Sequence, residues 1–400
     1  MTRSNHDSSC EKNILNNLLQ VSSPDTVTSN VVLNGNNDTT PVLWNHRKQF
    51  SQDRFMRYLQ KSLDQGKLSN DGPLQAVLGA KVKAAVRSVN DVLLACNGTA
   101  ALHALCIGLN LKYQKEIRWI TQAFTFSSCI NGSLAACQIA DMDPEHFGPS
   151  FAYLENHVDE FDGIIVTNVF GLQTNLLKYQ DWCDKHDKLL IQDNAASPIG
   201  FVENTEHTCI HDLGDGAIVS FHETKPFGRA EGGAIFARND VLTFVHQAMN
   251  FGFDIPANIR RPHRACSNWR MSDVAAAAIC DHLDFMESND WEERLQDLTK
   301  FAEFCLESNG MQLAFPIQYP TILSCLFIRL NEGNTPEKAL QRLLSHNIEA
   351  KHLYVPLCGR NDAPEAWKLF DSTICLPFHL EISRSQLRRI IQVAAGNMSH

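Results

Sequence analysis

The chain has 400 residues, of which 44% are hydrophobic, and its formal net charge is −10. This length and composition provide an ample core for two domains or one large domain, and the acidic balance argues against a nucleic-acid-binding protein, which needs clustered lysine and arginine. The thirteen cysteines include no Cys-x-x-Cys pair and the sixteen histidines show no metal-binding spacing, so reduced thiols are favoured over a disulfide framework or a zinc site.

The first 45 residues are rich in Ser, Asn, Asp and Thr and are expected to form a mostly disordered tail. They show no apolar leader segment, and no stretch of the chain approaches the roughly 18 apolar residues of a membrane span. The expected location is therefore the cytoplasm, with no membrane partner.

Residues 92–109 are predicted to form a strand, a tight turn and a helix, because apolar side chains of the second half follow the i, i+3, i+4, i+7 spacing of one helical face. Gly98 and Thr99 then lie at a helix N-terminus, where free backbone N–H groups and the helix dipole bind a phosphate. The alternative is an ordinary cap, in which Asn97 or Thr99 satisfies the first turn.

From about residue 90 the chain alternates short apolar runs with helical patterns. This alternation predicts an α/β fold, with a mainly parallel sheet covered by helices on both faces. Such a sheet binds its ligand at the carboxyl ends of the strands. Further strand candidates in this part are residues 117–120, 163–167, 189–191 and 217–221.

Two charged residues follow these apolar runs. Asp193 ends one of them, and a carboxylate at the end of a buried strand is costly unless a cation pairs with it. The protonated pyridine nitrogen of pyridoxal phosphate is such a cation. Lys225 follows another run, and its amine can form a Schiff base with an aldehyde only where burial or a neighbouring cation lowers its pKa. Taken alone, such a lysine is more often a solvated surface group.

The C-terminal part is predicted to form a small α+β domain. Residues 286–306 carry apolar side chains on one helical face and are expected to connect two domains. Residues 321–329 are predicted to form a strand. Ser383 to Gln386 are predicted to form a capping box at the start of the last helix. The expected division is a tail over 1–45, a large α/β domain over 46–260 and the small domain over 261–400.

The chain resembles the fold-type I pyridoxal-phosphate enzymes, the aspartate aminotransferase-like class, in the order of its motifs. The phosphate-binding turn at Gly98 comes first, and the acid Asp193, Ser220 and Lys225 follow. Roughly residues 60 to 395 resemble the DegT/DnrJ/StrS family of sugar aminotransferases. One matching motif is weak, but seven in the family's order are strong. They are Ser69–Pro73, Asn97–Leu102, Thr121–Phe126, Ala140–Pro144, Gly214–Gly233 with Ser220 and Lys225, Asn268–Ser272, and Leu376–Pro377.

The resemblance implies a role for each matching residue. Lys225 holds pyridoxal 5′-phosphate as a Schiff base and, once freed by substrate, moves the proton during transamination, while Asp193 pairs with the pyridinium nitrogen. The remaining cofactor-binding residues are Gly98, Thr99 and Ser220 at the phosphate, Phe126 packed on the ring, and Asn268, which reaches the phosphate from the neighbouring subunit of a homodimer with shared active sites.

Three positions depart from the family's pattern. Ala196 stands where a Gln or His usually meets the 3′-oxygen of the cofactor, so another group or a water must bond there. Ala230 and Glu223 replace a glycine and a proline, and neither change removes a catalytic atom. Some relatives replace the lysine by histidine and dehydrate sugars instead, whereas this chain keeps Lys225, which favours transamination.

The activity that the resemblance implies is ping-pong transamination in deoxyaminosugar biosynthesis, from an amino donor expected to be glutamate to a keto group on a nucleotide-linked deoxysugar. Pyridoxamine phosphate is the form of the cofactor between the two halves. The alternatives are a sugar dehydratase using the same cofactor, an aminotransferase with another keto acceptor such as a keto-cyclitol, and a non-catalytic relative, to which Ala196 gives some support.

Basic residues near the Asn268 motif are candidates for the diphosphate of a sugar nucleotide. Arg270 lies inside the motif, whereas Arg260, Arg261 and Arg264 are about equally well explained as a solvated loop. His222 flanks Ser220 and is expected to be a bystander.

Overall fold

The structure is a computed structural model that describes residues 40–45, 48–172, 174–202, 208–253, 264–317 and 321–397. Most of the predicted tail lies outside these residues. Of its last part, Val42 is buried and forms a parallel β-bridge with Ile348.

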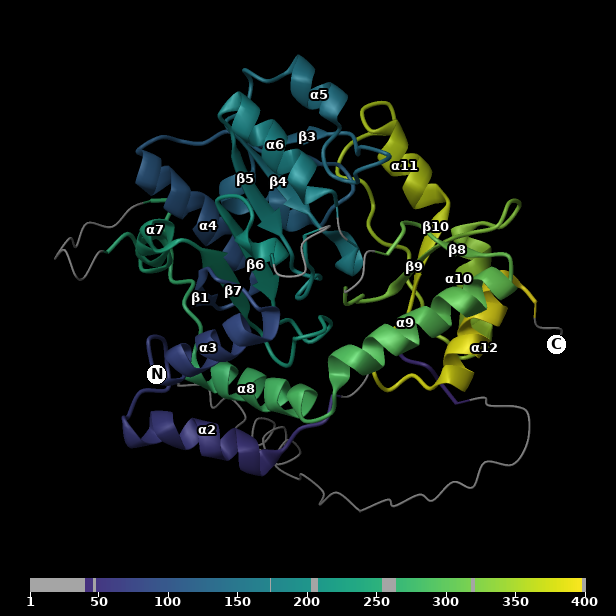
Figure 1. The fold of residues 1–400 in the computed structure, drawn as a ribbon, viewed down its shortest axis with the longest axis horizontal. Coiled ribbons are helices and arrows are strands. Elements are labelled where there is room, and N and C mark those ends of the chain that lie inside the picture. The colour runs from purple at the N-terminus through teal and green to yellow at the C-terminus, as the bar shows by residue number, and fades with distance from the viewer. Residues whose placement is uncertain are drawn as a thin grey trace, which may run out of the picture. The chain divides into compact units, whose positions relative to one another are not determined.

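A seven-stranded sheet in the order β1-β7-β6-β5-β4-β2-β3 confirms the mainly parallel sheet that the sequence predicts (Figure 1). β7 runs antiparallel to both of its neighbours, and the other pairs are parallel. Every strand predicted in this part lies within two residues of an observed one. The strands are β1 Asp91–Ala95, β2 Trp119–Gln122, β3 Gln138–Ala140, β4 Gly163–Thr167, β5 Leu189–Asp193, β6 Gly216–Ser220 and β7 Gly233–Ala237.

Helices cover both faces of this sheet because its strands alternate apolar side chains between the two sides. In β6, for example, Ile218 packs into one hydrophobic cluster while Ala217 and Val219 pack into another. The helices on the Ile218 face are α4 Gly98–Tyr113 and α7 Asn239–Met249. Those on the other face are α3 Leu74–Val86, α5 Phe151–Asn156, α6 Leu176–His186 and α8 Asp273–Glu287, and α2 Gln52–Asp64 packs on α3 and α8.

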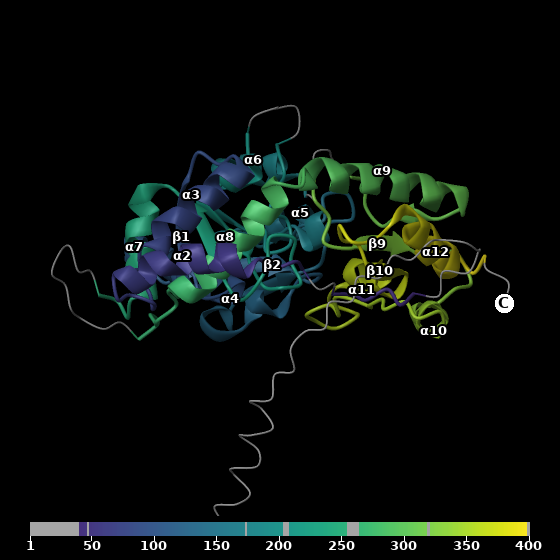
Figure 2. The same cartoon turned by 90° about the horizontal axis from the view of Figure 1, so that it is seen from below.

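The C-terminal part contains a three-stranded antiparallel sheet in the order β10-β9-β8, as expected for a small α+β domain. Helix α12 lies beside α9 and α10 (Figures 1 and 2). The predicted domain boundary at residue 260 lies outside the described residues and stays a prediction. The elements are α9 Trp291–Ser308, β8 Gln312–Leu313, β9 Leu326–Arg329, α10 Pro336–Ser345, α11 Pro364–Asp371, β10 Thr373–Leu376 and α12 Arg384–Ala395.

Two predictions in this part need correction. Residues 286–306 do not form one helix, because α8 ends at Glu287 and Asp290, with φ 48°, lies in the left-handed region before α9 begins. Ser288 and Asn289 donate side-chain hydrogen bonds to carbonyl groups of the preceding turn, which favours a helix end there. The strand expected over 321–329 is shorter and covers only β9.

The capping box at the start of α12 is confirmed. The Ser383 hydroxyl accepts from the Gln386 N–H at 3.2 Å, and the Gln386 side chain accepts from the Ser383 N–H at 3.0 Å. Within the described ranges, we find no helix that is long and apolar enough to cross a membrane.

Candidate active site

Strands β1, β4, β5 and β6 end at one cavity of about 410 Å³. Parallel strands bring their carboxyl ends to the same edge of a sheet, so residues far apart in the chain meet there. Six of the seven predicted site residues line this cavity, and Asn268 does not. The six are Gly98, Thr99, Phe126, Asp193, Ser220 and Lys225.

The N-terminus of α4 packs tightly against the end of β6. Asn97 caps the helix, since its side-chain oxygen accepts from the Ala100 N–H at 2.8 Å, so the predicted cap is present beside the cavity. A Cβ added at Gly98 would lie 2.8 Å from Ser220 Cβ and 3.0 Å from its hydroxyl. The glycine therefore brings the first turn of the helix and the Ser220 hydroxyl to one spot, where a phosphate can accept hydrogen bonds from both.

Asp193 is a buried acid, only 2% exposed, at the carboxyl end of β5. One carboxylate oxygen accepts from the Ala195 N–H at 3.0 Å, and the other accepts from the Cys129 thiol at 3.7 Å. Burial raises the pKa of Asp193, and the nearby Lys225 charge opposes this shift. A cation at the site would hold the carboxylate ionised.

Lys225 follows β6 in a tight turn, in which its N–H donates to the His222 carbonyl at 2.8 Å. Burial lowers the pKa of the Lys225 amine, and the Asp193 carboxylate raises it in part. A lowered pKa leaves more of the amine unprotonated, which is the form that attacks a carbonyl carbon. The structure thus places the Lys225 amine and the Asp193 carboxylate in the same cavity, where each shifts the pKa of the other.

An aromatic wall faces these groups. Phe126 is 50% exposed, and its ring meets that of Tyr354 edge to face at 5.7 Å. Tyr354 in turn stacks on Phe170 at 5.0 Å. Burial raises the pKa of the Tyr354 phenol, which therefore stays protonated. Sequence analysis did not identify Tyr354, because no motif marks it and it lies 129 residues after Lys225 in the chain.

Two polar residues at the end of β4 also line the cavity and were missed. The Thr125 hydroxyl donates to the Thr167 hydroxyl at 2.7 Å, and Asn168 donates to the side chain of Asn194 at 2.6 Å. The signal that identified Asp193, a polar residue directly after an apolar strand, applies equally to Thr167 and Asn168.

The departure at Ala196 places a methyl group in the cavity lining. Asn194, two residues earlier, uses its amide to donate to Gln192 at 3.1 Å and to Nδ1 of His211 at 3.0 Å. Burial lowers the pKa of His211 to about 4, so the imidazole is neutral and its Nδ1 can accept. This buried polar network fixes the loop after β5.

The other candidates lie in different places. Asn268 is exposed, and its side-chain oxygen accepts from Asn70 at 3.3 Å and from Arg270 at 3.2 Å. Arg270 forms an ion pair with Asp71 at 2.6 Å. Arg260 and Arg261 lie outside the described residues. His222, expected to be a bystander, lines the cavity and bonds to the Thr224 hydroxyl at 2.9 Å.

Solved structures resemble the described structure over most of its length. DesI, crystallised in the presence of its TDP-sugar product, has a TM-score of 0.76 and 21% identity, covering 89% of this chain and 92% of that one. The PLP form of Spr1654 from Streptococcus pneumoniae has a TM-score of 0.72 and 17% identity, covering 90% and 100%. The fold is that of the fold-type I PLP-dependent aminotransferases, as predicted.

The model of the DegT/DnrJ/EryC1/StrS aminotransferase family matches residues 50–394, and the chain belongs to this family. A relative, the dTDP-4-amino-4,6-dideoxy-D-glucose transaminase of Shigella dysenteriae, is 24% identical over 368 residues, which are 85% of this chain and 94% of the relative. This membership confirms the prediction of an aminotransferase that uses pyridoxal 5′-phosphate.

The cavity residues fit this cofactor. The buried Asp193 carboxylate accepts one backbone hydrogen bond and one weak thiol hydrogen bond, so it can still accept from a pyridinium nitrogen. Lys225 offers an amine of lowered pKa. The close packing of Gly98 on Ser220 places a helix N-terminus beside a hydroxyl, which suits a phosphate. When bound, the cofactor supplies an electron sink that stabilises negative charge on a substrate carbon.

Proposed function

We propose that this chain transfers an amino group from glutamate to a keto group on a nucleotide-linked deoxysugar, and that Lys225 is the residue that binds the cofactor through a Schiff base. The observation that carries the proposal is the convergence of Lys225 and Asp193, from different strand ends, on one cavity. The dTDP-sugar transaminase and the GDP-perosamine synthase of Vibrio cholerae among the relatives support a sugar acceptor.

Each residue then has a defined task. Lys225 would hold the cofactor through its amine and, once released by substrate, would carry the proton of the substrate carbon. Asp193 keeps the ring nitrogen protonated. Backbone amides at Gly98 and Thr99, with the Ser220 hydroxyl, hold the phosphate, and the Phe126 ring covers one face of the site and excludes water.

We further propose a homodimer in which Asn268 reaches the phosphate of the neighbouring subunit. Asn268 is exposed and does not line the cavity of its own chain, which agrees with a role toward a second copy. Phe126 is half exposed at the cavity for the same reason, since a surface covered in a dimer is open in one chain.

The experiment is an absorbance spectrum of the protein reconstituted with pyridoxal phosphate, recorded before and after glutamate is added. We expect glutamate to move the long-wavelength band to shorter wavelength in the wild type, and we expect no such band in Lys225→Ala. Lys188→Ala is the control, because the Lys188 amine donates to the Phe161 carbonyl at 2.8 Å and is not among the groups that line the cavity.

The outcomes separate the alternatives. Absence of the band in the reconstituted wild type would refute the assignment of Lys225. A band that ignores glutamate would favour another donor or the dehydratase alternative, which product analysis with a keto-sugar nucleotide then distinguishes.

A further inference from the structure

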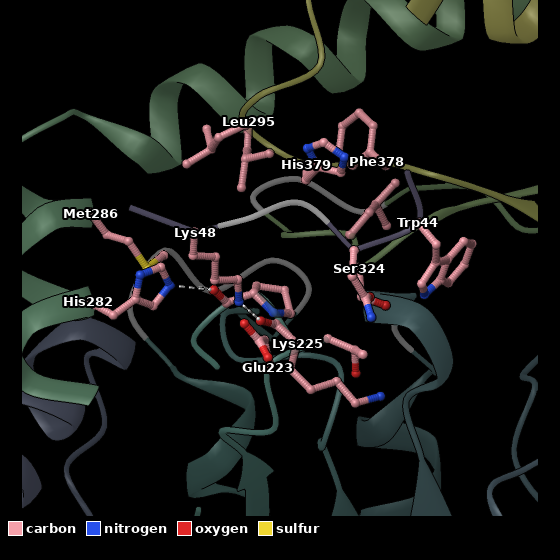
Figure 3. Close-up of a pocket in the computed structure, with 15 residues that line it drawn as sticks. Trp44, Lys48, Glu223, Lys225, His282, Met286, Leu295, Ser324, Phe378 and His379 are labelled. Carbon is pink, nitrogen blue, oxygen red and sulfur yellow. Dashed lines mark hydrogen bonds between the residues drawn. The ribbon is translucent and has the colours of Figure 1, made fainter. Parts of the chain in front are cut away.

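Lys48 is a buried cation on the outer side of the turn that carries Lys225. It is 6% exposed, and it lies just before residues 50–394, the span matched by the family model. Its Nζ donates to the backbone carbonyl of Lys225 at 2.6 Å and to that of Gly228. Figure 3 shows the Lys48 side chain directed at the backbone of this turn, near His282 and Lys225.

The turn is compact and depends on these contacts. The Gly228 N–H donates to the Lys225 carbonyl at 2.9 Å, and a Cβ at Gly228 would lie 1.7 Å from the His222 carbonyl oxygen. The turn therefore folds back on itself with no room for a side chain. Lys48 binds the carbonyl groups at both ends of the turn, residues 225 and 228.

A return contact completes the arrangement. The Arg229 guanidinium donates to the Lys48 carbonyl at 2.6 Å and lies over the Phe50 ring at 5.1 Å. The segment around Lys48 and the turn after β6 thus hold each other through hydrogen bonds in both directions. His282, from α8, meets the same turn at the Pro226 carbonyl, at 3.2 Å.

The charge at this position is costly. Burial, with a smaller effect of Arg229, lowers the pKa of Lys48 to about 7, although Glu223 and Glu381 oppose the shift. An apolar side chain of similar length would avoid the cost of burying an ammonium group. In the described part of the chain, the hydrogen bonds of this buried amine go to two carbonyls of the Lys225 turn.

We propose that Lys48 is a positioning residue, which fixes the place of the Lys225 amine in the cavity by binding both ends of the turn from residue 225 to residue 228. The inference rests on the proposed function of Lys225. Lys48 is not among the residues that line the large cavity, and its amine meets Lys225 at the backbone carbonyl, so it acts on the site through the turn. Displacements well under 1 Å at a reacting group lower rates, and about 1 Å can cost a hundred-fold.

The test compares full-length Lys48→Met, Lys48→Arg and Lys188→Met with the wild type. Each apoprotein is mixed with pyridoxal phosphate, the product is reduced with borohydride, and peptide mass spectrometry measures the rate of attachment at Lys225. We expect Lys48→Met to attach the cofactor about ten-fold more slowly, Lys48→Arg to recover most of the rate by restoring donors, and Lys188→Met to match the wild type.

Two further readouts exclude a merely structural role. The melting temperature of the Lys48→Met apoprotein should stay near that of the wild type, because the lost hydrogen bonds are offset by the removed burial of charge. With the cofactor bound, kcat should fall while the KM for glutamate stays unchanged, since Lys48 is not among the residues that line the cavity.

The inference is overturned if Lys48→Met attaches the cofactor at the wild-type rate. It is also overturned if the melting temperature and the attachment rate fall together and Lys48→Arg restores neither. Failure of the wild type to attach the cofactor at Lys225 is a different result, which refutes the proposed function itself.

Discussion

Substitution of Gly98 by alanine tests whether the contact between α4 and β6 forms the phosphate site. The new Cβ would lie 2.8 Å from Ser220 Cβ, whereas ordinary contacts begin at 3.4 Å, so the helix N-terminus and Ser220 must separate by about 0.6 Å. The hydroxyl of Ser220, at 3.0 Å, can rotate away, but its Cβ is fixed to the backbone and cannot move aside alone. Overpacking of this kind costs about 1–3 kcal/mol of stability.

We expect Gly98→Ala to bind pyridoxal phosphate about ten-fold more weakly, because the phosphate no longer meets the helix amides and the Ser220 hydroxyl at hydrogen-bond distance together. Fluorescence titration of the apoprotein measures the dissociation constant. At saturating cofactor, the KM for the amino donor should change little, since the substitution lies at the phosphate end of the site.

Gly79→Ala is the matched control. Gly79 also lies in a helix, α3, but a Cβ there would meet only the Val92 carbonyl oxygen, at 4.0 Å. Alanine should fit and stabilise the helix by about 1 kcal/mol. Unchanged cofactor affinity in Gly98→Ala, or an equal loss in Gly79→Ala, would contradict the reasoning.

Two further predictions concern buried titratable groups. Asp193→Asn should raise the melting temperature of the apoprotein, because burial raises the pKa of Asp193 and makes its charge costly. The same substitution should lower the transamination rate at least about a hundred-fold. A fall in both the melting temperature and the rate would show a structural role only. His211 should contribute a fall of about 3 kcal/mol in the free energy of unfolding as the pH drops from about 6.5 to 4, since burial lowers its pKa to about 4 and only the unfolded chain then binds the proton. Urea unfolding across this range, with a shallower pH dependence in His211→Gln, checks the second prediction, and a flat wild-type curve would exclude it.

Much of the sheet, and the meeting of six of the seven predicted site residues at one cavity, could be predicted because local signals mark them. Asp193 and Ser220 end apolar strands, and the Gly98 turn precedes a helical apolar face, so the strand ends alone bring them to one edge. The helix break at Asp290 was missed because a periodic apolar pattern continues across it, although the Ser288 and Asn289 side chains favour a helix end.

Lys48 and Tyr354 could not be predicted for a different reason. Neither lies in a motif, and each meets the site through a tertiary contact across more than a hundred residues of chain. A lysine in a polar N-terminal segment is ordinarily solvated. Only the packing of that segment on the Lys225 turn shows that this one is buried.

Tyr354, one of the three rings of the aromatic wall, comes from a part of the chain that supplies none of the predicted cofactor residues. Tyr354 belongs to the segment that runs beside β10, where Lys351 pairs with Cys375, whereas Asp193, Ser220 and Lys225 belong to the large sheet and its loops. Mutations in the C-terminal segment can therefore reshape the entrance of the site while the reacting groups stay in place.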